Sequence, residues 1–503
     1  MSGTVDPMET HGVDRARPLE IDPETFRRLG HRLVDRLAEW LITMPSGPVT
    51  RGESADVLRA ALGTSAMPAA GADPATVLDE AADLVIEHSL FNGHPRFMGY
   101  ITSSAAPLGA LADLLASSVN PNCGSYGLSP IGTLIETQAV QWIAEMLGLP
   151  AGAGGLLVSG GNMANMVAFW AARASAGGPD VRARGTVGTR LTAYCSTETH
   201  TWIQKAADLS GLGTDAVRWI PVDAEQRMRT SELARRIAAD RAAGDTPFLV
   251  VGTAGTVSTG AVDPLAEIAE ICRAERLWFH VDGAYGAPAA IVPGAPADLR
   301  AMSAADSVAV DPHKWLYAPL EVGCTLVRDP ATLRAAFSYH PVYYHFDSHE
   351  ADPPPNFYEL GPQNSRGFRA LKVWMGLKMA GRDGYTRMIA DDIALAQQLF
   401  ARADAHPELE AVSCRLSIAT FRYVPPGADR RSPDQSPLDA LNSRVLDALQ
   451  QSGRAYVSNA VVDGRFVLRA CIVNFRTGSA DLDALVTAVV EIGRTLAASD
   501  SKK

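Results

Sequence analysis

Short apolar runs alternate with segments of helical periodicity between residues 156 and 327, and this alternation constrains the fold most strongly. One intervening helix is expected to begin at Asp263-Pro264, because Asp is a preferred N-cap and Pro suits the first helical position. The pattern predicts an α/β fold with a mostly parallel central sheet covered by helices on both faces, and in such sheets ligands bind beyond the carboxyl ends of the strands. The expected strands are Leu156–Val158, Leu191–Cys195, Val217–Ile220, Phe248–Gly252, Trp278–Asp282, Ser307–Val310 and Gly323–Val327.

The length and charge of the chain limit the class of protein. A chain of 503 residues is expected to form about two or three folded units. Its net charge of −11 argues against nucleic acid or an anionic membrane as a partner, and no apolar stretch is long enough to cross a bilayer. The six cysteines are scattered without a CxxC pair, which is typical of core residues in a reducing compartment and not of a metal site. We therefore expect a cytoplasmic protein.

The first hundred residues differ in pattern from the rest of the chain. Residues 1–20 are polar and unpatterned, and we expect them to form a disordered tail. Residues 21–100 form an N-terminal helical segment, with one helix from Asp22-Pro23 to about Met44 and a second over Pro74–Ser89. These helices are too few to close a core of their own, so we expect them to pack on another domain or subunit.

The remainder is expected to form a large and a small domain. Residues 101–384 contain the strands of the parallel sheet and a long connection at 337–362, rich in aromatic residues and Pro, which is a candidate lid. Residues 385–503 are expected to form a small C-terminal α+β domain. Its strands are predicted near Ser417–Tyr423 and Phe466–Asn474.

Residues able to bind a phosphate and a carbonyl stand at or near the expected strand ends. Gly160-Gly161-Asn162 opens a helix, where free amides and the helix dipole favour a phosphate. His200 follows one strand and Asp282 closes another, while Lys314 follows the next strand within Asp311–Trp315. A lysine amine in such a place is suited to form an imine with a carbonyl. A phosphate cradle, a buried carboxylate and a strand-end lysine together suggest pyridoxal 5'-phosphate (PLP) as cofactor, because the carboxylate would keep the pyridine nitrogen protonated.

Five motifs give the chain a family resemblance. They are His-Pro-Arg-Phe at 94–97, Ser-Gly-Gly at 159–161, Gly-Thr-Ala-Gly-Thr at 252–256, His-Val-Asp-Gly-Ala-Tyr at 280–285 and Asp-Pro-His-Lys-Trp at 311–315. The chain resembles the group II PLP-dependent amino acid decarboxylases, the family of aromatic-L-amino-acid and glutamate decarboxylases. The resemblance implies a fold-type-I PLP enzyme that acts as a homodimer, with active sites at the subunit interface. We expect the N-terminal helical segment to pack at that interface.

The resemblance also assigns roles to individual residues. It gives Lys314 the covalent bond with PLP, Asp282 the pyridine nitrogen and His200 the stacking on the ring. Asn162 departs from the family, because many relatives have Ser or Thr there, and Asp311 departs because many have Asn. An acidic side chain beside a phosphate is unfavourable, so Asp311 is expected to cap a backbone group or to pair with a cation. The residues expected to bind the cofactor, besides these three, are Gly160, Gly161, Asn162, Thr256, Ala284, Asp311 and His313.

The candidate substrate residues are Tyr100, Ile101, Gly124 and Tyr126. They are mostly apolar or aromatic and include no basic group for a side-chain carboxylate, which favours an aromatic L-amino acid over glutamate. Gly124 falls where the animal enzymes commonly carry an aromatic residue, and glycine there would widen the pocket. Arg469 is either structural or holds a carboxylate, and the sequence does not separate these roles.

The expected reaction is decarboxylation to the amine and CO2. Tyr343 resembles the lid tyrosine that delivers a proton to Cα in the family, and relatives with Phe at that place tend towards oxidative aldehyde formation. We expect Tyr343 to be catalytic. The alternatives are an aldehyde synthase, a decarboxylase of an acidic amino acid such as glutamate, and an aminotransferase of the same fold. A catalytically silent scaffold is disfavoured, because Lys314, Asp282 and His200 are all present.

Overall fold

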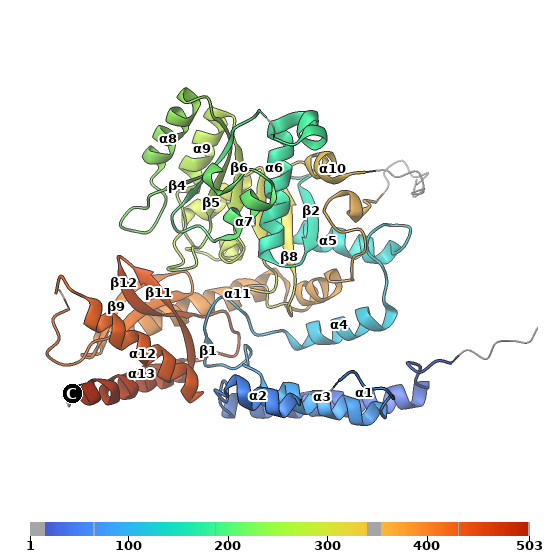
Figure 1. The fold of residues 1–503 in the computed structure, drawn as a ribbon, viewed down its shortest axis with the longest axis vertical. Helices are drawn as coiled ribbons and strands as arrows, with labels where there is room; N and C mark the ends of the chain where they lie inside the picture. Colours follow the sequence, from blue (N-terminus) through green and yellow to red (C-terminus); the bar gives the residue numbers. More distant parts are fainter. Residues whose placement is uncertain (1–15, 64–65, 187, 340–353, 431, 501–503) are drawn as a thin grey trace, which may run out of the picture. The chain divides into compact units, whose positions relative to one another are not determined.

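The computed structural model describes residues 16–63, 66–186, 188–339, 354–430 and 432–500. The chain divides into two compact units, Met1–Leu90 and Phe91–Lys503 (Figure 1). None of the helices within the described ranges is long and apolar enough to cross a bilayer.

Three α-helices and a short 3-10 helix form the described part of the first unit: α1 (Pro23–Thr43), η1 (Met44–Ser46), α2 (Ala55–Leu62) and α3 (Pro74–His88). The helices α1 and α3 begin where the sequence predicts, because Asp22 and Asp73 each accept hydrogen bonds from amides of the first turn and Pro follows each cap. The sequence did not predict α2. Leu29 is the single buried residue in these three α-helices, all of whose residues the structure describes. The unit therefore leaves many apolar side chains exposed.

A seven-stranded sheet lies at the centre of the second unit. Its strand order is β2-β8-β7-β6-β5-β3-β4, and all neighbours are parallel except that β8 runs antiparallel to β2 and β7. This confirms the predicted mostly parallel sheet. The strands are β2 (Gly154–Val158), β3 (Leu191–Ser196), β4 (Val217–Ile220), β5 (Thr246–Thr253), β6 (Trp278–Asp282), β7 (Ser307–Val310) and β8 (Gly323–Val327).

Helices cover both faces of this sheet, as predicted, because successive side chains of a strand point to opposite faces. Val250 and Val308 belong to a core cluster with residues of α5, α8 and α9, whereas Leu249 packs in a separate cluster with residues of α6 and α7. Figure 1 shows α8 and α9 beside β4 to β6. The helices of this part are α4 (Pro107–Val119), α5 (Pro130–Met146), α6 (Gly161–Arg184), α7 (Trp202–Leu209), η2 (Thr214–Ala216), α8 (Thr230–Ala242), α9 (Leu265–Glu275), η3 (Ala287–Ile291), η4 (Ala297–Ala304), α10 (Ala331–Phe337) and η5 (Phe357–Glu359).

The predicted start of α9 is wrong in one detail. The N-cap is Pro264 rather than Asp263, and no side chain caps the helix. Asp263 is fully buried, and its carboxylate accepts hydrogen bonds from the amides of Met228 and Thr253. The side chain therefore ties two backbone segments together instead of capping a helix. Burial raises the pKa of this carboxyl to about 6.

The C-terminal part contains a second sheet with the strand order β1-β11-β12-β10-β9. Its first strand, β1 (Phe97–Met98), comes from early in the chain and pairs in parallel with β11, while the other pairs are antiparallel. The long helix α11 (Ala370–Ala405) packs against α4 and α5 and also against β9 and β10, and it is interrupted at Gly381 (Figure 1). The remaining elements are β9 (Leu409–Arg415), β10 (Ile418–Tyr423), α12 (Ser436–Ser452), β11 (Tyr456–Val462), β12 (Arg465–Cys471) and α13 (Ser479–Asp500).

Candidate active site

A cavity of about 360 Å³ opens at the carboxyl ends of the strands of the large sheet. Residues that follow β2, β3 and β7 line it together with the last residues of β5 and β6, as expected for a ligand site in a sheet of this kind. Of the residues singled out in the sequence, the cavity brings together Ile101, Gly161, Asn162, His200, Asp282, Ala284, Asp311, His313 and Lys314.

Lys314 reaches the cavity from the loop that follows β7. Its Nζ lies 3.1 Å from Asp311 Oδ2, and its backbone amide donates a hydrogen bond to the Asp311 carbonyl. Asp311 is buried, and the Nε2 of His313 lies 3.6 Å from the same carboxylate oxygen. Of the two arrangements expected for Asp311, the structure therefore has the pairing with a cation. The imidazole of His313 is fixed in turn, because its Nδ1 lies 2.8 Å from the Val322 carbonyl oxygen.

Asp282 is the last residue of β6 and is buried. Its Oδ2 accepts a 2.7 Å hydrogen bond from the indole Nε1 of Trp202, and its Oδ1 accepts one of 3.2 Å from the Ala284 amide. Neutral donors thus satisfy this carboxylate, and no lysine or arginine of the described residues lies within ion-pair distance of it. A buried carboxylate without a cation keeps its charge available for a positively charged group of a ligand.

His200 faces the cavity at the turn between β3 and α7. Its Nδ1 lies 3.2 Å from the Trp202 amide and accepts that hydrogen bond. Desolvation by the surrounding atoms lowers the pKa of the imidazole, an effect that outweighs the opposing influence of Asp282. At neutral pH the ring is therefore neutral, and because Nδ1 is an acceptor its proton lies on Nε2. A neutral imidazole is suited to stack on an aromatic ring.

The start of α6 forms a close-packed turn beside Asp311. Gly160 is the N-cap of α6 and has a φ of 85°, which favours glycine. A Cβ on Gly161 would clash with the Asp311 carboxylate, so glycine is needed there as well. Two buried oxygens at the cavity, Asp311 Oδ1 and Thr253 Oγ1, have no hydrogen-bond partner among the described residues. Free first-turn amides and the Thr253 hydroxyl can donate hydrogen bonds to the oxygens of a phosphate, whereas the Asp311 oxygen can only accept one.

The groups around the cavity fit PLP, for which no metal is needed. The start of α6 can bind the phosphate, Lys314 can react with the carbonyl carbon, and Asp282 can pair with the ring nitrogen. Across the described residues, no group of three His, Cys, Asp or Glu side chains is placed to hold a metal ion.

The sequence missed several residues that line the cavity, among them Ser159, Asn165, Glu198, Thr253 and Trp202. Thr253 closes β5, and the rule that ligands collect at strand ends identifies such a position. Asn165 lies one turn into α6, where its Nδ2 donates to the Gly161 carbonyl and its Oδ1 lies 2.7 Å from His280 Nε2. Burial lowers the pKa of His280 to about 4, so this imidazole is neutral.

Five of the described residues predicted for the site are not among those that line the cavity: Gly160, Thr256, Tyr100, Gly124 and Tyr126. Thr256 is fully buried and its hydroxyl accepts a hydrogen bond from the Ala261 amide, whereas the adjacent Gly255 and Val257 face the cavity. Tyr100 is 55% exposed and has a φ of 51°. Gly124 and Tyr126 lie on the loop before α5, and Tyr343 lies outside the described residues.

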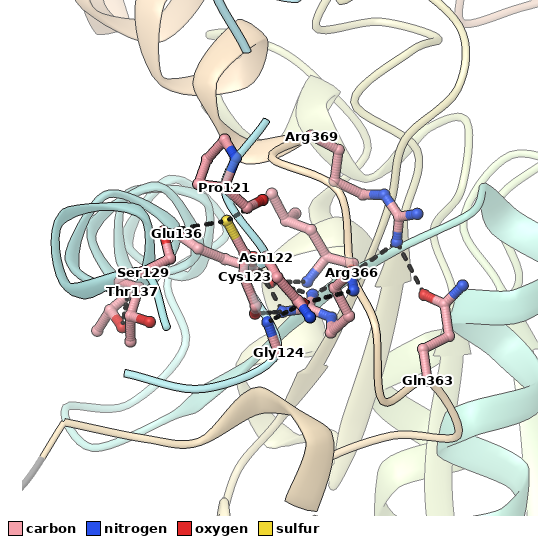
Figure 2. A network of polar contacts seen from close by, with 12 residues as sticks. Pro121, Asn122, Cys123, Gly124, Ser129, Glu136, Thr137, Gln363, Arg366 and Arg369 are labelled. Atoms are coloured by element: carbon pink, nitrogen blue, oxygen red, sulfur yellow. Dashed lines mark hydrogen bonds and ion pairs between the residues drawn. The ribbon is translucent and has the colours of Figure 1, made fainter. Parts of the chain in front are cut away.

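Gly124 is buried within the polar network of Figure 2. Its amide donates a 3.0 Å hydrogen bond to Asn122 Oδ1, and its carbonyl accepts one of 2.9 Å from the Tyr358 amide. A Cβ at this position would clash with the carbonyl oxygen of Asn364. The close approach of two backbone segments therefore explains the glycine.

A buried ion pair fixes the loop that carries Gly124 (Figure 2). Arg366 Nη2 lies 2.5 Å from Glu136 Oε1 and 2.6 Å from the Leu157 carbonyl oxygen, while its Nη1 donates to the Cys123 carbonyl. Both charged side chains are almost completely inaccessible to solvent. Removing one partner of such a pair costs about 3–5 kcal/mol, because the other charge stays buried. The pair thus joins α5, the end of β2 and the loop before α5.

Arg469 is buried, and its Nη1 donates to the Tyr100 carbonyl and to Ser458 Oγ at 3.0 Å each. Its guanidinium therefore holds the backbone of the segment that leads into the cavity. These contacts support a structural role, but Nε and Nη2 are buried without a hydrogen-bond partner among the described residues, so the structure does not separate this role from that of holding a carboxylate.

Three comparisons identify the family. The model of the pyridoxal-dependent decarboxylase conserved domain matches residues 61–424. This chain belongs to the pyridoxal-dependent decarboxylases. The aromatic-L-amino-acid decarboxylase of Bacillus atrophaeus is 33% identical over 92% of this chain and 94% of its own length. The L-2,4-diaminobutyrate decarboxylase of Rhizobium meliloti is 32% identical over 86% of this chain and 84% of its length.

A solved structure confirms the fold class. The crystal structure of Oryza sativa TDC with PLP and tryptamine superposes with a TM-score of 0.88 and 27% identity, covering 96% of this chain and 100% of that one. The predicted fold-type-I architecture and the PLP cofactor are thereby confirmed. This pyridoxal-dependent decarboxylase is a carboxy-lyase that acts on an amino acid.

Proposed function

We propose that this decarboxylase converts an aromatic L-amino acid to the corresponding amine and CO2. The composition of the cavity carries the proposal: Ile101 and Val257 line it, and Lys314 is the only lysine or arginine among its described lining residues. A substrate with a side-chain carboxylate would find no second cation to pair with, whereas an apolar ring suits such a wall. The similarity to the aromatic-L-amino-acid decarboxylase supports the same class of substrate.

In this proposal each residue of the cavity has a separate role in binding PLP or in the reaction. PLP, when bound, supplies a carbonyl that reacts with amines and a ring that withdraws electrons from Cα. Lys314 provides the amine that attaches the cofactor. Asp282 holds a proton on the ring nitrogen through its charge, and the neutral His200 packs on the ring face. The first amides of α6 bind the phosphate.

Glu198 favours a second candidate function, the decarboxylation of an amino acid with a cationic side chain. Glu198 is among the residues that line the cavity, and no basic side chain of the described residues forms an ion pair with it. Such a carboxylate can pair with the ammonium group of a substrate such as 2,4-diaminobutyrate. The similarity to the Rhizobium meliloti enzyme supports this alternative.

Measuring CO2 release by the PLP-loaded enzyme separates the candidates. We expect release from tryptophan, tyrosine or phenylalanine and little from glutamate or 2,4-diaminobutyrate. The Lys314→Ala variant serves as the control and is expected to fold without turnover, because the amine that attaches the cofactor is absent. Release from 2,4-diaminobutyrate alone, lost in Glu198→Gln, would favour the second candidate. Wild-type turnover in Lys314→Ala would contradict the assignment of the lysine.

The proposal includes a homodimer with active sites at the subunit interface. Exposed apolar side chains gather on α4 and the start of α5, which supports such an interface: Leu111, Leu114, Leu115, Val119, Ile131 and Leu134. Tyr126 is only partly buried and is absent from the cavity lining of its own chain, which suits a contribution to the site of a second subunit.

We also propose the cytoplasm as the compartment. All six cysteines are free thiols, and all but Cys414 are buried. Free thiols without disulfides suit a reducing environment.

A further inference from the structure

Trp202 is one of the residues that line the cavity. It is the first residue of α7, and its side chain is completely buried. The indole packs edge-on against His280, with ring centroids 5.7 Å apart, and against Phe169 at 6.4 Å. Because these rings hold it on two sides, the indole has one well-defined orientation.

Two hydrogen bonds connect Trp202 to residues proposed to face the cofactor. Its backbone amide donates to His200 Nδ1 at 3.2 Å, and its indole Nε1 donates to Asp282 Oδ2 at 2.7 Å. The first bond leaves the imidazole proton on Nε2. The second fixes one carboxylate oxygen, so that the plane of the carboxylate is set by a rigid ring.

We propose that Trp202 is a positioning residue that orients Asp282 and His200 together towards the PLP ring. This inference rests on the roles proposed above for these two residues. Trp202 acts through both of them: the indole sets the angle of the carboxylate, and the backbone amide sets the tautomer of the imidazole.

The chemistry of an indole suits this role better than that of a basic side chain. An indole is a neutral group that only donates, so it orients a carboxylate without cancelling its charge. A lysine or arginine in the same place would neutralise Asp282 and weaken its hold on a protonated ring nitrogen. The nearby His280 adds no positive charge, because its nitrogens are engaged by Asn165 and Ser307 and its ring is neutral.

The Trp202→Phe variant tests the indole bond alone, because it keeps an aromatic ring and the backbone amide. A hydrogen bond to a charged group is lost, so we expect the PLP dissociation constant to rise and kcat to fall, each by about tenfold to a hundredfold. The KM for substrate is expected to change by less than about twofold, because Trp202 orients the ring partner and not the substrate. Trp202→His, which restores a ring N–H, is expected to recover part of both losses.

A double-mutant cycle with Asp282→Asn shows whether Trp202 acts through the carboxylate. In the Asp282→Asn background, Trp202→Phe is expected to cost less than about threefold further, because the oriented charge is already absent. The matched control is Trp278→Phe, which removes an indole bond to Ser307 from the other end of β6 and should leave PLP affinity and kcat unchanged. Unfolding of the cofactor-free variants, followed by circular dichroism, reports whether each of them folds.

The results of these experiments test the inference on Trp202 separately from the proposed role of Asp282. Wild-type PLP affinity and kcat in Trp202→Phe would overturn the inference, as would equal losses in both backgrounds of the cycle. If Trp202→Phe fails to fold, the same measurements on Trp202→Leu, which also lacks a ring N–H, decide, and wild-type PLP affinity and kcat there would overturn the inference. Wild-type activity in Asp282→Asn would instead contradict the proposed role of Asp282.

Discussion

Two carboxylates at the cavity, Asp282 and Asp311, have opposite surroundings. Asp311 pairs with Lys314 at 3.1 Å, whereas Asp282 is held by an indole and a backbone amide. A paired carboxylate has little charge left to offer a ligand, while an unpaired buried one favours a cationic partner strongly. At the residue scale these surroundings support the proposal that Asp282 is the partner of the ring nitrogen, while Asp311 pairs with the lysine.

Asp282→Asn tests this assignment. A neutral amide keeps the shape of the side chain but cannot stabilise a protonated ring nitrogen by charge, so we expect kcat to fall on the order of a hundredfold or more. Asp306→Asn is the matched control, because that carboxylate accepts a hydrogen bond from the Phe279 amide at the opposite end of β6. Steady-state CO2 release is to be measured for both variants. A decrease in kcat of less than about threefold in Asp282→Asn would show that the residue is merely structural.

Tyr343→Phe tests which product forms. If the tyrosine hydroxyl delivers the proton to Cα, its loss leaves the carbanionic state open to oxygen for longer. We expect less amine, together with aldehyde and hydrogen peroxide under air, while the absorbance of bound PLP stays unchanged. Amine, aldehyde and peroxide are to be assayed in parallel. An unaltered amine yield would assign the proton donor to another group, with His200 or a bound water as the next candidates.

At the scale of elements, α11 holds the loop that carries Lys314. Asp392 of α11 is buried, and its Oδ2 accepts hydrogen bonds from Trp315 Nε1 at 2.8 Å and from the Tyr317 hydroxyl at 2.7 Å. Trp315 also stacks on Tyr285, with centroids 4.8 Å apart. Burial raises the pKa of Asp392 to about 7, although the two hydrogen bonds oppose this.

The raised pKa of Asp392 predicts a pH effect on stability. Between about pH 4 and pH 7 the folded state keeps the proton while the unfolded state has lost it, so the free energy of unfolding falls as pH rises through this window. Asp392→Asn removes this proton, and its stability relative to wild type is expected to increase from pH 4 to pH 7. Urea denaturation at several pH values measures the difference, with Asp383→Asn as control, because Asp383 is an exposed residue of the same helix. Parallel pH profiles for wild type and Asp392→Asn would contradict the prediction.

The elements also show what a sequence can and cannot predict. The bounds of β6, β7 and β8 agree with the prediction, because continuous apolar runs ended by polar residues or Pro mark buried strands. The edge strand β9 was missed, since it is only partly buried and mixes polar with apolar residues. Helix α2 was missed in the same way, as it buries none of its own residues, all of which are described.

The sequence predicts those site residues that stand at the ends of strands. It does not predict those whose place in the site depends on packing between distant segments. Strand ends identified Asp282 and the loop of Lys314. The positive φ of 95° at Gly255 turns the chain there, and Thr256 is buried next to residues that face the cavity. The sequence does not distinguish Trp202 from an ordinary core aromatic residue. Its contact with Asp282 joins residues 80 positions apart, and only the folded chain brings them together.

At the scale of the whole molecule, the second unit combines a well-packed interior with an apolar surface on α4. Leu111, Leu114 and Leu115 are each about half exposed, and Val119 is 68% exposed. Soluble monomers seldom present so many neighbouring apolar side chains to water, and in our proposal a second copy of the chain covers this surface. Since the cavity lacks the candidate substrate residue Tyr126, activity is expected to depend on that association.

Leu114→Asp combined with Leu115→Asp tests this dependence. Two charges on the apolar surface of α4 cannot be buried without partners, so we expect dissociation to monomers and a loss of CO2 release of at least tenfold, on the order of the cost of burying an unpaired charge. The far-ultraviolet circular dichroism is expected to stay unchanged, because both side chains are exposed in the single chain. Leu209→Asp is the matched control, since Leu209 is 70% exposed at the end of α7. Sedimentation velocity and activity assays on both variants decide, and a double variant that sediments and reacts like wild type would contradict an interface on α4.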